Sequence, residues 1–476
     1  MELCVFAVST FAFTARYTSH HVATATNATS TRSGLLRDLG ASQAASIVVG
    51  VVIGSGIFLV PAEMMQAAGS ARLVYLAWIV GGIFSFFGAV TYAQLGAMKP
   101  QSGGEYVYIR DAYGPLAGFL TGWTWTLVVK PSSLAAISTG IVRVLANFPS
   151  LHFLATQVGN IPVTWGQMVA MGFVIFVSFV NYIGVKRAGN FQLAFTVLKI
   201  VLIVAISALA FSAHGSWAHF AEKYSGAIGG VAGFFAALTA ALWAYDGWSD
   251  LNMVAEEVHN PERNVPLALV GGLVVIGALY MLVNAAVQYA MPAISVAQSS
   301  SPMSDAVHAS FLGAGAAIVV SVAMVISLTS SLNGVAMSGS RMAFALARDG
   351  NFFSSLAKVH PRFHTPHVAT FTQAVLSICF LLIGGNFRQL FTLAIFAEWL
   401  SYMAASSSLF VFRKKLVPEP RPSFWQYPLA PAFFVLASAA LLYYTFTSNL
   451  RYSAMGSLVI LAGIPVYYGF ALRRRS

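Results

Sequence analysis

Residues 52–58 read VIGSGIF, and this stretch interrupts the first long apolar run of the chain. A second interruption, LWAYDGWSD, occupies residues 242–250 inside the sixth such run. Glycine costs about 1 kcal/mol in a helix interior and tolerates unwound backbone, and an aspartate at bilayer depth costs at least about 2.5 kcal/mol. A small-x-small pattern alone also suits helix packing. The two interruptions together favour the interpretation that both helices are broken.

Outward from these stretches, apolar runs fill most of the chain. A transmembrane helix needs about 20 mostly apolar residues, and helices are the default because irregular backbone cannot face lipid. The fold class is therefore predicted to be an all-α polytopic membrane protein. The sequence predicts twelve transmembrane helices at approximately 43–67, 73–98, 114–146, 166–184, 190–212, 229–255, 266–291, 311–340, 366–385, 389–412, 428–447 and 453–471.

The composition points to the same class. The chain has 476 residues, of which 58% are hydrophobic and 9% are charged, whereas soluble domains carry about 25% charged residues. The formal net charge is +11, but the basic residues lie in loops between apolar runs rather than in a stripe interleaved with aromatic residues. This distribution is typical of membrane topology. The expected surroundings are a lipid bilayer, and nucleic acid is not an expected partner.

The basic residues also predict the orientation, because cytoplasmic loops are enriched in Lys and Arg. With the N-terminus inside, the opposite loops hold only Arg72, Lys223, Arg388 and Arg451. An even number of spans leaves both termini in the cytoplasm, and we expect a plasma (inner) membrane location. Residues 1–40 lack the basic start of a signal peptide. They are interpreted as a disordered cytoplasmic tail; the alternative is an over-extended start codon that adds about the first 30 residues.

Five blocks of motifs identify a family. In their order along the chain they resemble the amino acid–polyamine–organocation superfamily and, within it, the L-type amino acid transporter branch. The blocks are GSGIF at 54–58, KPQSGGEY at 99–106, KPSS at 130–133, WAYDGW at 243–248 with EEV at 256–258 and NPERN at 260–264, and SGSR at 338–341 with ARDG at 347–350.

The resemblance implies a leucine-transporter-like fold, with ten core helices in two inverted repeats of five and two peripheral helices. The expected units are residues 41–212 and 229–412 for the repeats, and 428–476 for the peripheral helices and the basic C-terminus. Interrupted segments at matching positions of two halves indicate a binding site between inverted repeats. The first and sixth helices match in this way, and alternating access around their site is implied.

An amino acid is a zwitterion, so a site for it needs donors for the carboxylate and acceptors for the ammonium. A half-helix offers free N–H groups at its N-terminal end and free carbonyls at its C-terminal end. Ser55 and Gly56 begin the outer half of the first helix and are assigned to the carboxylate. The resemblance implies that the carbonyls of Ile53, Trp243 and Asp246 accept from the ammonium. The complete predicted set is Ile53, Gly54, Ser55, Gly56, Trp243, Ala244, Asp246 and Gly247.

Two residues of this set have additional predicted roles. Trp243 is the predicted gate, because relatives place an aromatic residue there that caps the substrate from outside; a packed core tryptophan is the alternative. For Asp246 three roles stay open. Its carboxylate could read a cationic substrate, titrate as a proton site or bond to the unwound backbone.

Lys199 lies about mid-run in the fifth predicted helix, where a charged side chain is costly. In sodium-independent members of the family a lysine here takes the place of a bound cation. The resemblance therefore implies that the ammonium contacts carbonyls near Gly54, and it argues against sodium coupling. A buried lysine can also exchange a proton, so proton symport and exchange between substrates both remain open.

The other charged residues receive structural interpretations. Lys130 is predicted to pair with nearby carbonyls, and Asp250 is predicted to face the cytoplasmic vestibule. Glu256, Glu257 and Arg263 are interpreted as a solvated ion-pair patch on the cytoplasmic side.

Catalytic and metal-binding patterns are not expected. His360, His364 and His367 cluster after the eighth helix without an acidic or cysteine partner, and the sequence contains no H-E-x-x-H and no phosphate-binding loop. We expect no metal, no cofactor and no enzymatic activity. Cys4 and Cys379 indicate no disulfide framework. Animal members of the family pair with a glycoprotein through an extracellular cysteine; no predicted outer loop has one, so this partner is not expected.

The predicted function is a sodium-independent secondary transporter of neutral L-amino acids that works by exchange or proton coupling. One alternative is transport of a cationic amino acid or polyamine, with Asp246 reading the extra charge. Another alternative, of a different class, is a sensor or receptor that binds an amino acid without moving it.

Overall fold

Long apolar helices joined by short polar connections make up the structure. The computed structural model describes residues 34–383, 387–415, 422–448 and 450–473. Within these ranges the regular structure is helical, and the β-type contacts are three isolated bridges, Leu39–Val258, Ser70–Lys223 and Gln157–Thr164.

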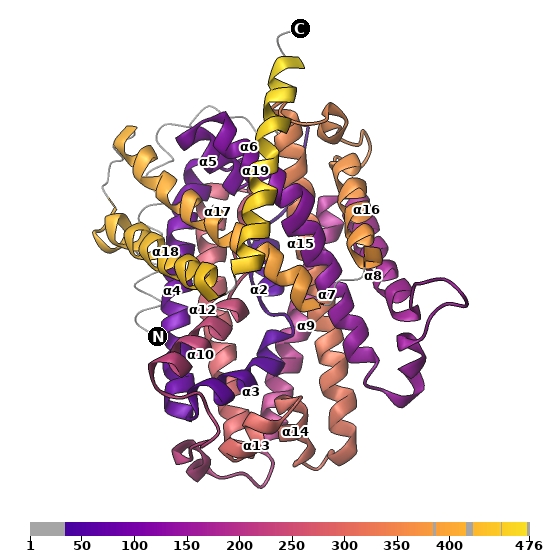
Figure 1. Cartoon of the computed structure of the whole chain (residues 1–476), viewed down its shortest axis with the longest axis vertical. Helices are drawn as coiled ribbons and strands as arrows, with labels where there is room; N and C mark the ends of the chain where they lie inside the picture. Colours follow the sequence, from indigo (N-terminus) through magenta and orange to yellow (C-terminus); the bar gives the residue numbers. More distant parts are fainter. Residues whose placement is uncertain (1–33, 384–386, 416–421, 449, 474–476) are drawn as a thin grey trace.

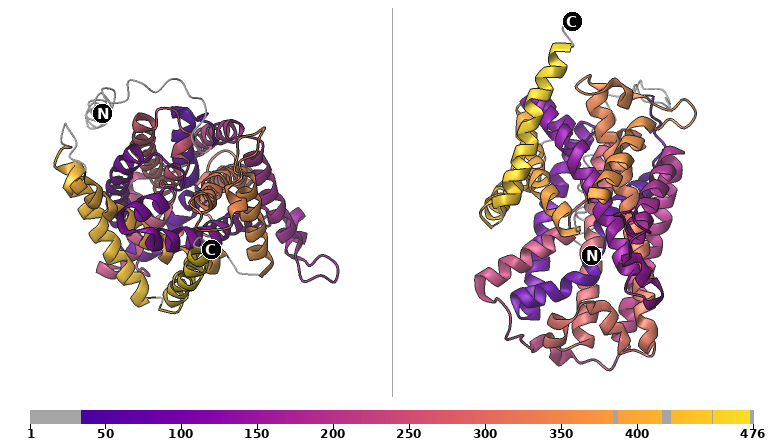
Figure 2. Two further views of the ribbon diagram at one scale, coloured as in Figure 1. Left: turned by 90° about the horizontal axis from the view of Figure 1, so that it is seen from above. Right: turned by 45° about the vertical axis from the view of Figure 1, so that its right-hand side comes forward.

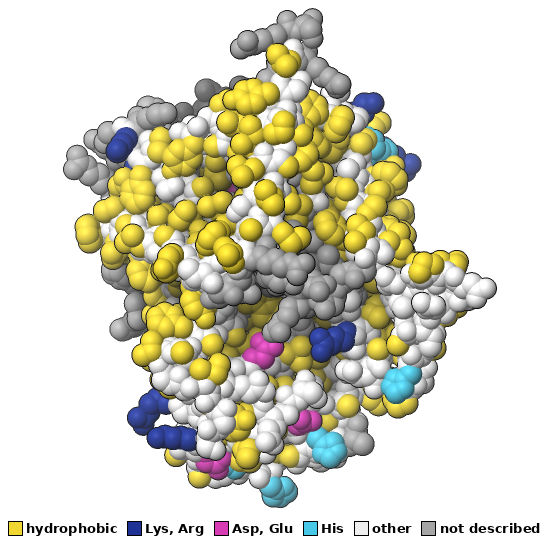
Figure 3. All heavy atoms as spheres, in the orientation of Figure 1, with side chains coloured by type: hydrophobic (Ala, Val, Ile, Leu, Met, Phe, Trp, Pro, Cys, Tyr) yellow, Lys and Arg dark blue, Asp and Glu magenta, His cyan; other side chains and the backbone are white. Residues whose placement is uncertain are grey.

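Eight helical stretches in the described ranges are long and apolar enough to cross a bilayer, so the chain is a multi-pass membrane protein. Apolar side chains are dense over the upper part of the face shown in Figure 3, and charged side chains are few on this face. The stretches are α4 (Ala71–Met98), Pro115–Leu145, α8 (Trp165–Tyr182), α9 (Val185–Phe211), α12 (Pro261–Ala290), α15 (Ala316–Arg348), Trp425–Thr447 and Ser453–Phe470. The second comprises α6 (Pro115–Thr124), η2 (Trp125–Val129) and α7 (Lys130–Leu145); the last two belong to η8 (Trp425–Leu429) with α18 (Ala430–Ser448) and to α19 (Leu450–Arg473).

Two further segments are interrupted at the glycine-containing stretches. Helix α2 (Ala41–Val52) stops at Val52, and α3 (Gly56–Ala68) starts at Gly56 after a bend of 40°, so this pair adds a ninth candidate span. Helix α10 (Gly230–Ala244) stops at Ala244, and the short α11 (Asp250–Met253) resumes at Asp250. We call residues 53–55 the first break and residues 245–249 the second break.

The remaining helices are shorter or less apolar. They are α5 (Glu105–Tyr113), η3 (Pro149–Ala155), η4 (Trp217–Ala221), η5 (Ala255–Glu257), α13 (Ala293–Gln298), α14 (Pro302–His308), η6 (Gly313–Gly315), η7 (Ser354–Ala357), α16 (His367–Ile383) and α17 (Phe387–Lys415). Helix α5 lies near one end of the molecule, and α13 and α14 lie at the other (Figure 1).

The two breaks lie inside the helix bundle. Helix α15 packs on α2, α7 and α9, and α12 packs on α2 and α4. The C-terminal helices α18 and α19 lie on the outside of this arrangement, where α18 contacts α4 and α17, and α19 contacts α6 and α17 (Figure 2). Both breaks are thus surrounded by other helices and are shielded from lipid.

Several helices start or end outside the predicted ranges. Helix α9 begins at Val185 rather than near 190, and α15 runs to Arg348 rather than to about 340. The predicted ranges counted only apolar residues, whereas helical hydrogen bonds continue into water past the end of an apolar run.

Part of the predicted N-terminal tail is packed. Leu35 and Leu39 are fully buried, and the amide of Leu39 donates to the carbonyl of Glu257 at 3.0 Å. These apolar side chains dock on the connection after α11. Residues 1–33, which contain Cys4, lie outside the described residues.

Candidate functional site

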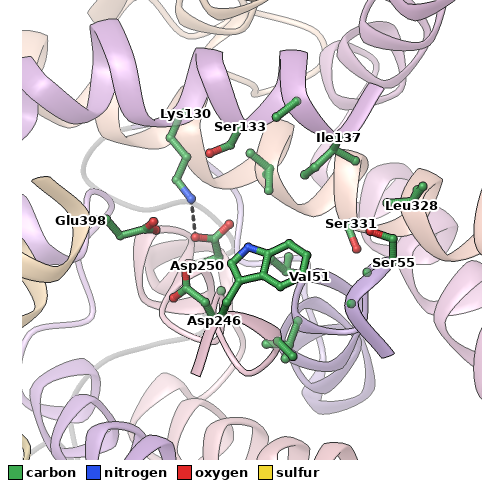
Figure 4. A pocket seen from close by; sticks show the side chains of 18 residues that line it. Val51, Ser55, Lys130, Ser133, Ile137, Asp246, Asp250, Leu328, Ser331 and Glu398 are labelled. Carbon is green, nitrogen blue, oxygen red and sulfur yellow. Dashed lines mark hydrogen bonds and ion pairs between the residues drawn. The ribbon is translucent and has the colours of Figure 1, made fainter. Parts of the chain in front are cut away.

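A cavity of about 110 Å³ lies where the two breaks meet (Figure 4). Its wall comes from both breaks and from α7, α15 and α17. Every predicted substrate-binding residue except Ile53 lines it: Gly54, Ser55, Gly56, Trp243, Ala244, Asp246 and Gly247. The structure therefore brings together two sequence segments that are almost 200 residues apart in the chain.

The two ends of the cavity differ in chemistry. Ser55, Ser331 and Leu328 lie at one end, and the charged side chains of Lys130, Asp250, Asp246 and Glu398 gather at the other (Figure 4). A solute that spans the cavity meets a backbone-rich end and an ionisable end.

The first break offers backbone donors to this cavity. Ser55 precedes α3 as its N-cap and its side chain makes no capping hydrogen bond. The first N–H groups of a helix lack partners within the helix and carry the positive end of the dipole. Gly56 lies close to the gate candidate, because a Cβ on Gly56 would lie 3.5 Å from Trp243 Cζ3.

Ile53 is buried behind the cavity wall and has a different environment from its predicted neighbours. Its carbonyl oxygen accepts from Lys199 Nζ at 2.7 Å, from Ser327 Oγ at 2.7 Å and from Ser331 Oγ at 3.3 Å. A carbonyl oxygen has two lone pairs. Protein donors therefore already occupy the acceptor that the resemblance assigned to the substrate ammonium.

Lys199 is fully buried on α9 and lies behind the first break. Its ammonium donates to the carbonyls of Gly50 at 2.9 Å, Ile53 at 2.7 Å and Ser327 at 3.0 Å. An ammonium has three N–H donors, and three carbonyls from α2, the first break and α15 accept them. The side chain stays in the bundle interior and does not extend to a membrane interface.

The second break depends on a glycine conformation. Gly247 has φ of +105°, and a Cβ there would lie 2.7 Å from Val51 Cγ1. Tyr280 Oη lies 2.5 Å from the carbonyl oxygen of Ala244 and 3.3 Å from that of Val52. Tyr280 thus connects the last carbonyls of α10 and α2. Tyr280 could not be predicted from the sequence, since a tyrosine inside an apolar run gives no local signal.

The predictions for Lys130 and Asp250 were wrong. Lys130 forms an ion pair with Asp250, and both side chains are buried and line the cavity. Asp250 also accepts from Ser338 Oγ at 2.7 Å, and Lys130 Nζ lies 5.0 Å from the Trp125 ring centroid. Buried charges need a partner of opposite sign. That rule predicts that each residue needs a partner of opposite sign, but the identity of the partner depends on the packing of α7 against α11.

Sequence reasoning also missed Glu398 on α17. Glu398 is 7% exposed and lines the cavity, and its Oε1 lies 3.0 Å from Tyr402 Oη. The same hydroxyl lies 3.1 Å from Asp246 Oδ1. An acidic residue inside the tenth apolar run was the available signal.

The expected solvated patch at the cytoplasmic end is mostly buried. Glu257 accepts from Arg341 at 2.7 and 3.0 Å, and both side chains are fully buried. Glu256 pairs with Arg348 at 2.9 Å, whereas Arg263 is exposed. Burial raises the pKa of Glu257, and Arg341 opposes that rise. The acidic pair thus anchors η5, which follows α11, to α15.

Glu105 at the start of α5 is a second buried carboxyl outside the apolar spans. It is fully buried, and burial raises its pKa to about 7. Burial is the largest cause of this rise, and the nearby positive charge of Lys130 opposes it. This group changes charge near neutral pH.

The histidine cluster makes structural contacts. His364 Nδ1 lies 3.2 Å from the carbonyl oxygen of Gly34, and the rings of His360 and His367 are 5.3 Å apart. Across the part of the chain that the structure describes, no group of three or more His, Cys, Asp or Glu residues is placed to hold a metal ion.

A small cavity lined by two helix breaks inside a bundle of membrane helices is the kind of site that a carrier of a small polar solute needs. The family model of amino acid permeases matches residues 39–470, and the chain belongs to this family. It is a membrane transporter of amino acids and not an enzyme.

Similar proteins support this assignment. The chain is 30% identical over 451 residues to the serine/threonine exchanger SteT of Bacillus subtilis, covering 93% of this chain and 99% of that protein. It is 30% identical over 446 residues to the human b(0,+)-type amino acid transporter 1, covering 92% and 88%. It is also 30% identical over 434 residues to the cystine/glutamate transporter of Pongo abelii, covering 90% and 84%.

Proposed function

We propose that the chain is a sodium-independent secondary transporter of neutral L-amino acids that works by alternating access. The observation that carries the proposal is the meeting of both breaks at one cavity. Such a cavity can bind the α-carboxylate and α-ammonium, which all α-amino acids share, through backbone groups that carry only partial charges. A serine/threonine exchanger among the relatives favours small neutral substrates. The proposal leaves exchange and proton coupling as the two modes.

The proposed head-group site uses the backbone. The N–H groups at Ser55 and Gly56 bind the carboxylate, because the N-terminal end of a helix favours an anion. The carbonyls of Trp243 and Asp246 receive the ammonium, together with the backbone around Gly54, Ala244 and Gly247. Ile53 contributes indirectly: Lys199 binds its carbonyl and thereby fixes the backbone of the first break.

Lys199 and Trp243 complete the proposed machinery. The ammonium of Lys199 fills the place that a bound sodium ion would occupy, since it ties together carbonyls of the first break and α15. Trp243 packs beside Gly56 and is proposed to close over the substrate from outside.

The proposed membrane arrangement has twelve spans, the first and sixth of them broken. Residues 41–212 and 229–412 form inverted repeats of five helices, and 428–476 form the peripheral pair with the basic C-terminus. Both termini lie in the cytoplasm, and the location is the plasma (inner) membrane. A disulfide-linked glycoprotein subunit is not part of the proposal.

A second candidate is transport of a cationic amino acid or polyamine. Asp246 and Glu398 lie at the end of the cavity opposite Ser55, where a substrate side chain would point (Figure 4). An Asp246→Asn variant separates the candidates. If the variant loses uptake of cationic substrates alone, the cationic candidate is correct. If the wild type takes up no cationic substrate and the variant still takes up neutral amino acids, the neutral candidate is correct.

A counterflow screen of the twenty amino acids in proteoliposomes, with and without a pH gradient, tests the function. Labelled amino acid should accumulate against an unlabelled internal pool of its own kind. Binding without counterflow would replace the transporter with a sensor or receptor. Replacement of sodium by choline should leave counterflow unchanged.

A further inference from the structure

We propose that Asp246, Tyr402 and Glu398 together hold one exchangeable proton, and that the movement of this proton is coupled to amino acid transport. The proposal rests on the function proposed above and names the coupling site within it. We call these three residues the carboxyl pair and its bridging tyrosine.

The three side chains come from two elements. Asp246 lies in the second break, and Glu398 and Tyr402 lie one turn apart on α17. Tyr402 Oη is 3.1 Å from Asp246 Oδ1 and 3.0 Å from Glu398 Oε1, and Ser249 Oγ donates to the same hydroxyl at 3.2 Å. Tyr402 is fully buried, whereas both carboxyl groups line the cavity.

Counting the hydrogen atoms requires one extra proton. A phenolic hydroxyl has a single hydrogen to donate, so it can bond to only one of the two carboxyl oxygens. The other carboxyl, if ionised, would place its lone pairs against those of Tyr402 at hydrogen-bond distance. If that carboxyl is protonated, it donates to Tyr402 Oη and the arrangement is satisfied. Two close carboxylates also disfavour a second ionisation.

The surrounding charges do not replace this proton. Among the described residues that line the cavity, Lys130 is the one cation, and it is paired with Asp250. The titratable groups facing the carboxyl pair are Lys130 of α7, Asp250 of α11 and Glu105 of α5, with Tyr92 of α4 packed edge-on against the Tyr402 ring. One cation therefore faces several carboxyl groups.

Lys199 is a poorer proton carrier than the carboxyl pair. Each of its three N–H bonds points to a carbonyl. Loss of a proton would leave one carbonyl facing the nitrogen lone pair, at the cost of an unmade buried hydrogen bond. Lys199 thus acts as a fixed charge, and the proton is bound and released at the carboxyl pair.

Coupling follows from the division between the second break and α17. When these elements move relative to each other, Tyr402 can no longer bridge the two carboxyl groups. The lone-pair repulsion that the extra proton relieves is then absent, and the proton is held less tightly. The proton then leaves through the cavity that both carboxyl groups line. Because Asp246 belongs to the proposed substrate site, substrate binding and proton binding both depend on the position of the second break relative to α17.

Proteoliposome uptake under an imposed pH gradient tests the coupling. The exterior is made about one pH unit more acidic than the interior. For the wild type, the ratio of initial uptake under this gradient to uptake at equal pH should be about ten, because one bound proton per transport cycle corresponds to a factor of about ten per pH unit. In Glu398→Gln the ratio should fall to about 1. The matched control is Glu63→Gln, an exposed carboxyl on α3, which should keep the wild-type ratio. A Glu398→Gln variant that keeps it too overturns the coupling.

Infrared difference spectroscopy detects the proton without any need for transport. Wild-type protein at neutral pH should show a protonated carboxylic acid C=O band that shifts in heavy water. Asp246→Asn and Glu398→Gln should each lose the band of this single protonated carboxyl, because without one acid the Tyr402 hydrogen alone satisfies the other. An unchanged band in both variants overturns the protonated pair even if counterflow is normal. Absence of counterflow in the wild type overturns the proposed function and the coupling, while the infrared band still decides the protonated pair.

Discussion

The first and second breaks are held open by opposite chemistry. At the first break, carbonyl oxygens face the buried ammonium of Lys199 and the hydroxyls of Ser327 and Ser331. At the second break the carboxyl group of Asp246 faces Tyr402, and directly after the break the carboxyl group of Asp250 pairs with Lys130. Broken helices leave bare polar groups that need partners away from water. The cation supplies a permanent partner at one break, and exchangeable protons and ion pairs supply it at the other.

The comparison indicates a division of labour. At the first break the Ile53 carbonyl has permanent partners in Lys199, Ser327 and Ser331, and none of these partners is a titrating acid. The second break carries carboxyl groups, and the neighbouring Glu398 and Glu105 add two more. The fixed region suits recognition of a constant head group, and the titrating region suits coupling and side-chain selection.

Removal of Lys199 should have the largest effect. Lys199→Ala leaves buried carbonyls of α2, the first break and α15 without a donor, at a cost of about 3 kcal/mol, so uptake should fall about 100-fold. Uptake in proteoliposomes and thermal unfolding in detergent measure the change. Lys186→Ala, an exposed lysine on the same helix, is the control and should transport normally. If Lys199→Ala took up substrate at the wild-type rate at every pH, Lys199 would have no role in holding the first break.

Ser55→Leu should remove substrate binding and leave the fold intact. A leucine at the start of α3 blocks the proposed carboxylate site, and the loss of charge-assisted hydrogen bonds of about 1.5–3 kcal/mol corresponds to about 10–100-fold in affinity. Equilibrium binding of a labelled substrate measures this. Ser42→Leu on the exposed face of α2 should bind as the wild type does. Normal affinity in Ser55→Leu would refute the carboxylate assignment.

Gly247→Ala should distort the second break. The new Cβ would lie 2.7 Å from Val51 Cγ1 at a φ of +105°, and the strain should cost about 1–3 kcal/mol. We expect lower thermal stability and slower uptake. Gly184→Ala is the matched control, since Gly184 has φ of +133° and no atom within 4 Å of its added Cβ. Equal losses in both variants would mean that only the backbone conformation matters.

Titration of Glu105 should have the smallest effect. Its pKa of about 7 in the folded chain lies above the ordinary 4.5, so the folded state keeps a proton that the unfolded state releases. Stability should therefore fall as pH rises from about 4.5 to about 7. Glu105→Gln should remove roughly 2–4 °C of this decline in unfolding temperature. Glu262→Gln, an exposed acid, should leave the decline in place.

Much of the architecture could be predicted because bilayer physics acts on composition and length. The membrane class, the family and the position of both interruptions followed from apolar runs and from glycine and aspartate inside them. Helix ends were less predictable. Helix α9 starts in the polar stretch around Lys186, where an apolar count gives no information.

The site was predictable in its backbone and not in its charges. Glycine and small residues mark where a helix is weak, which is a local property of the chain. The pairing of Lys130 with Asp250 joins residues 120 apart in sequence, and Glu398 reaches the cavity from a different helix. Such contacts depend on how helices cross, and no local pattern encodes that.

The sequence by itself determined that this protein lies in a membrane and has two weak points in its helices, because the cost of glycine and charge in an apolar helix is local. Only the tertiary structure decided that the weak points share a cavity, that Lys199 satisfies one of them and that Tyr402 bridges two acids at the other. The reason is physical: a buried polar group must find its partner within about 3 Å, and that distance is set by packing between helices.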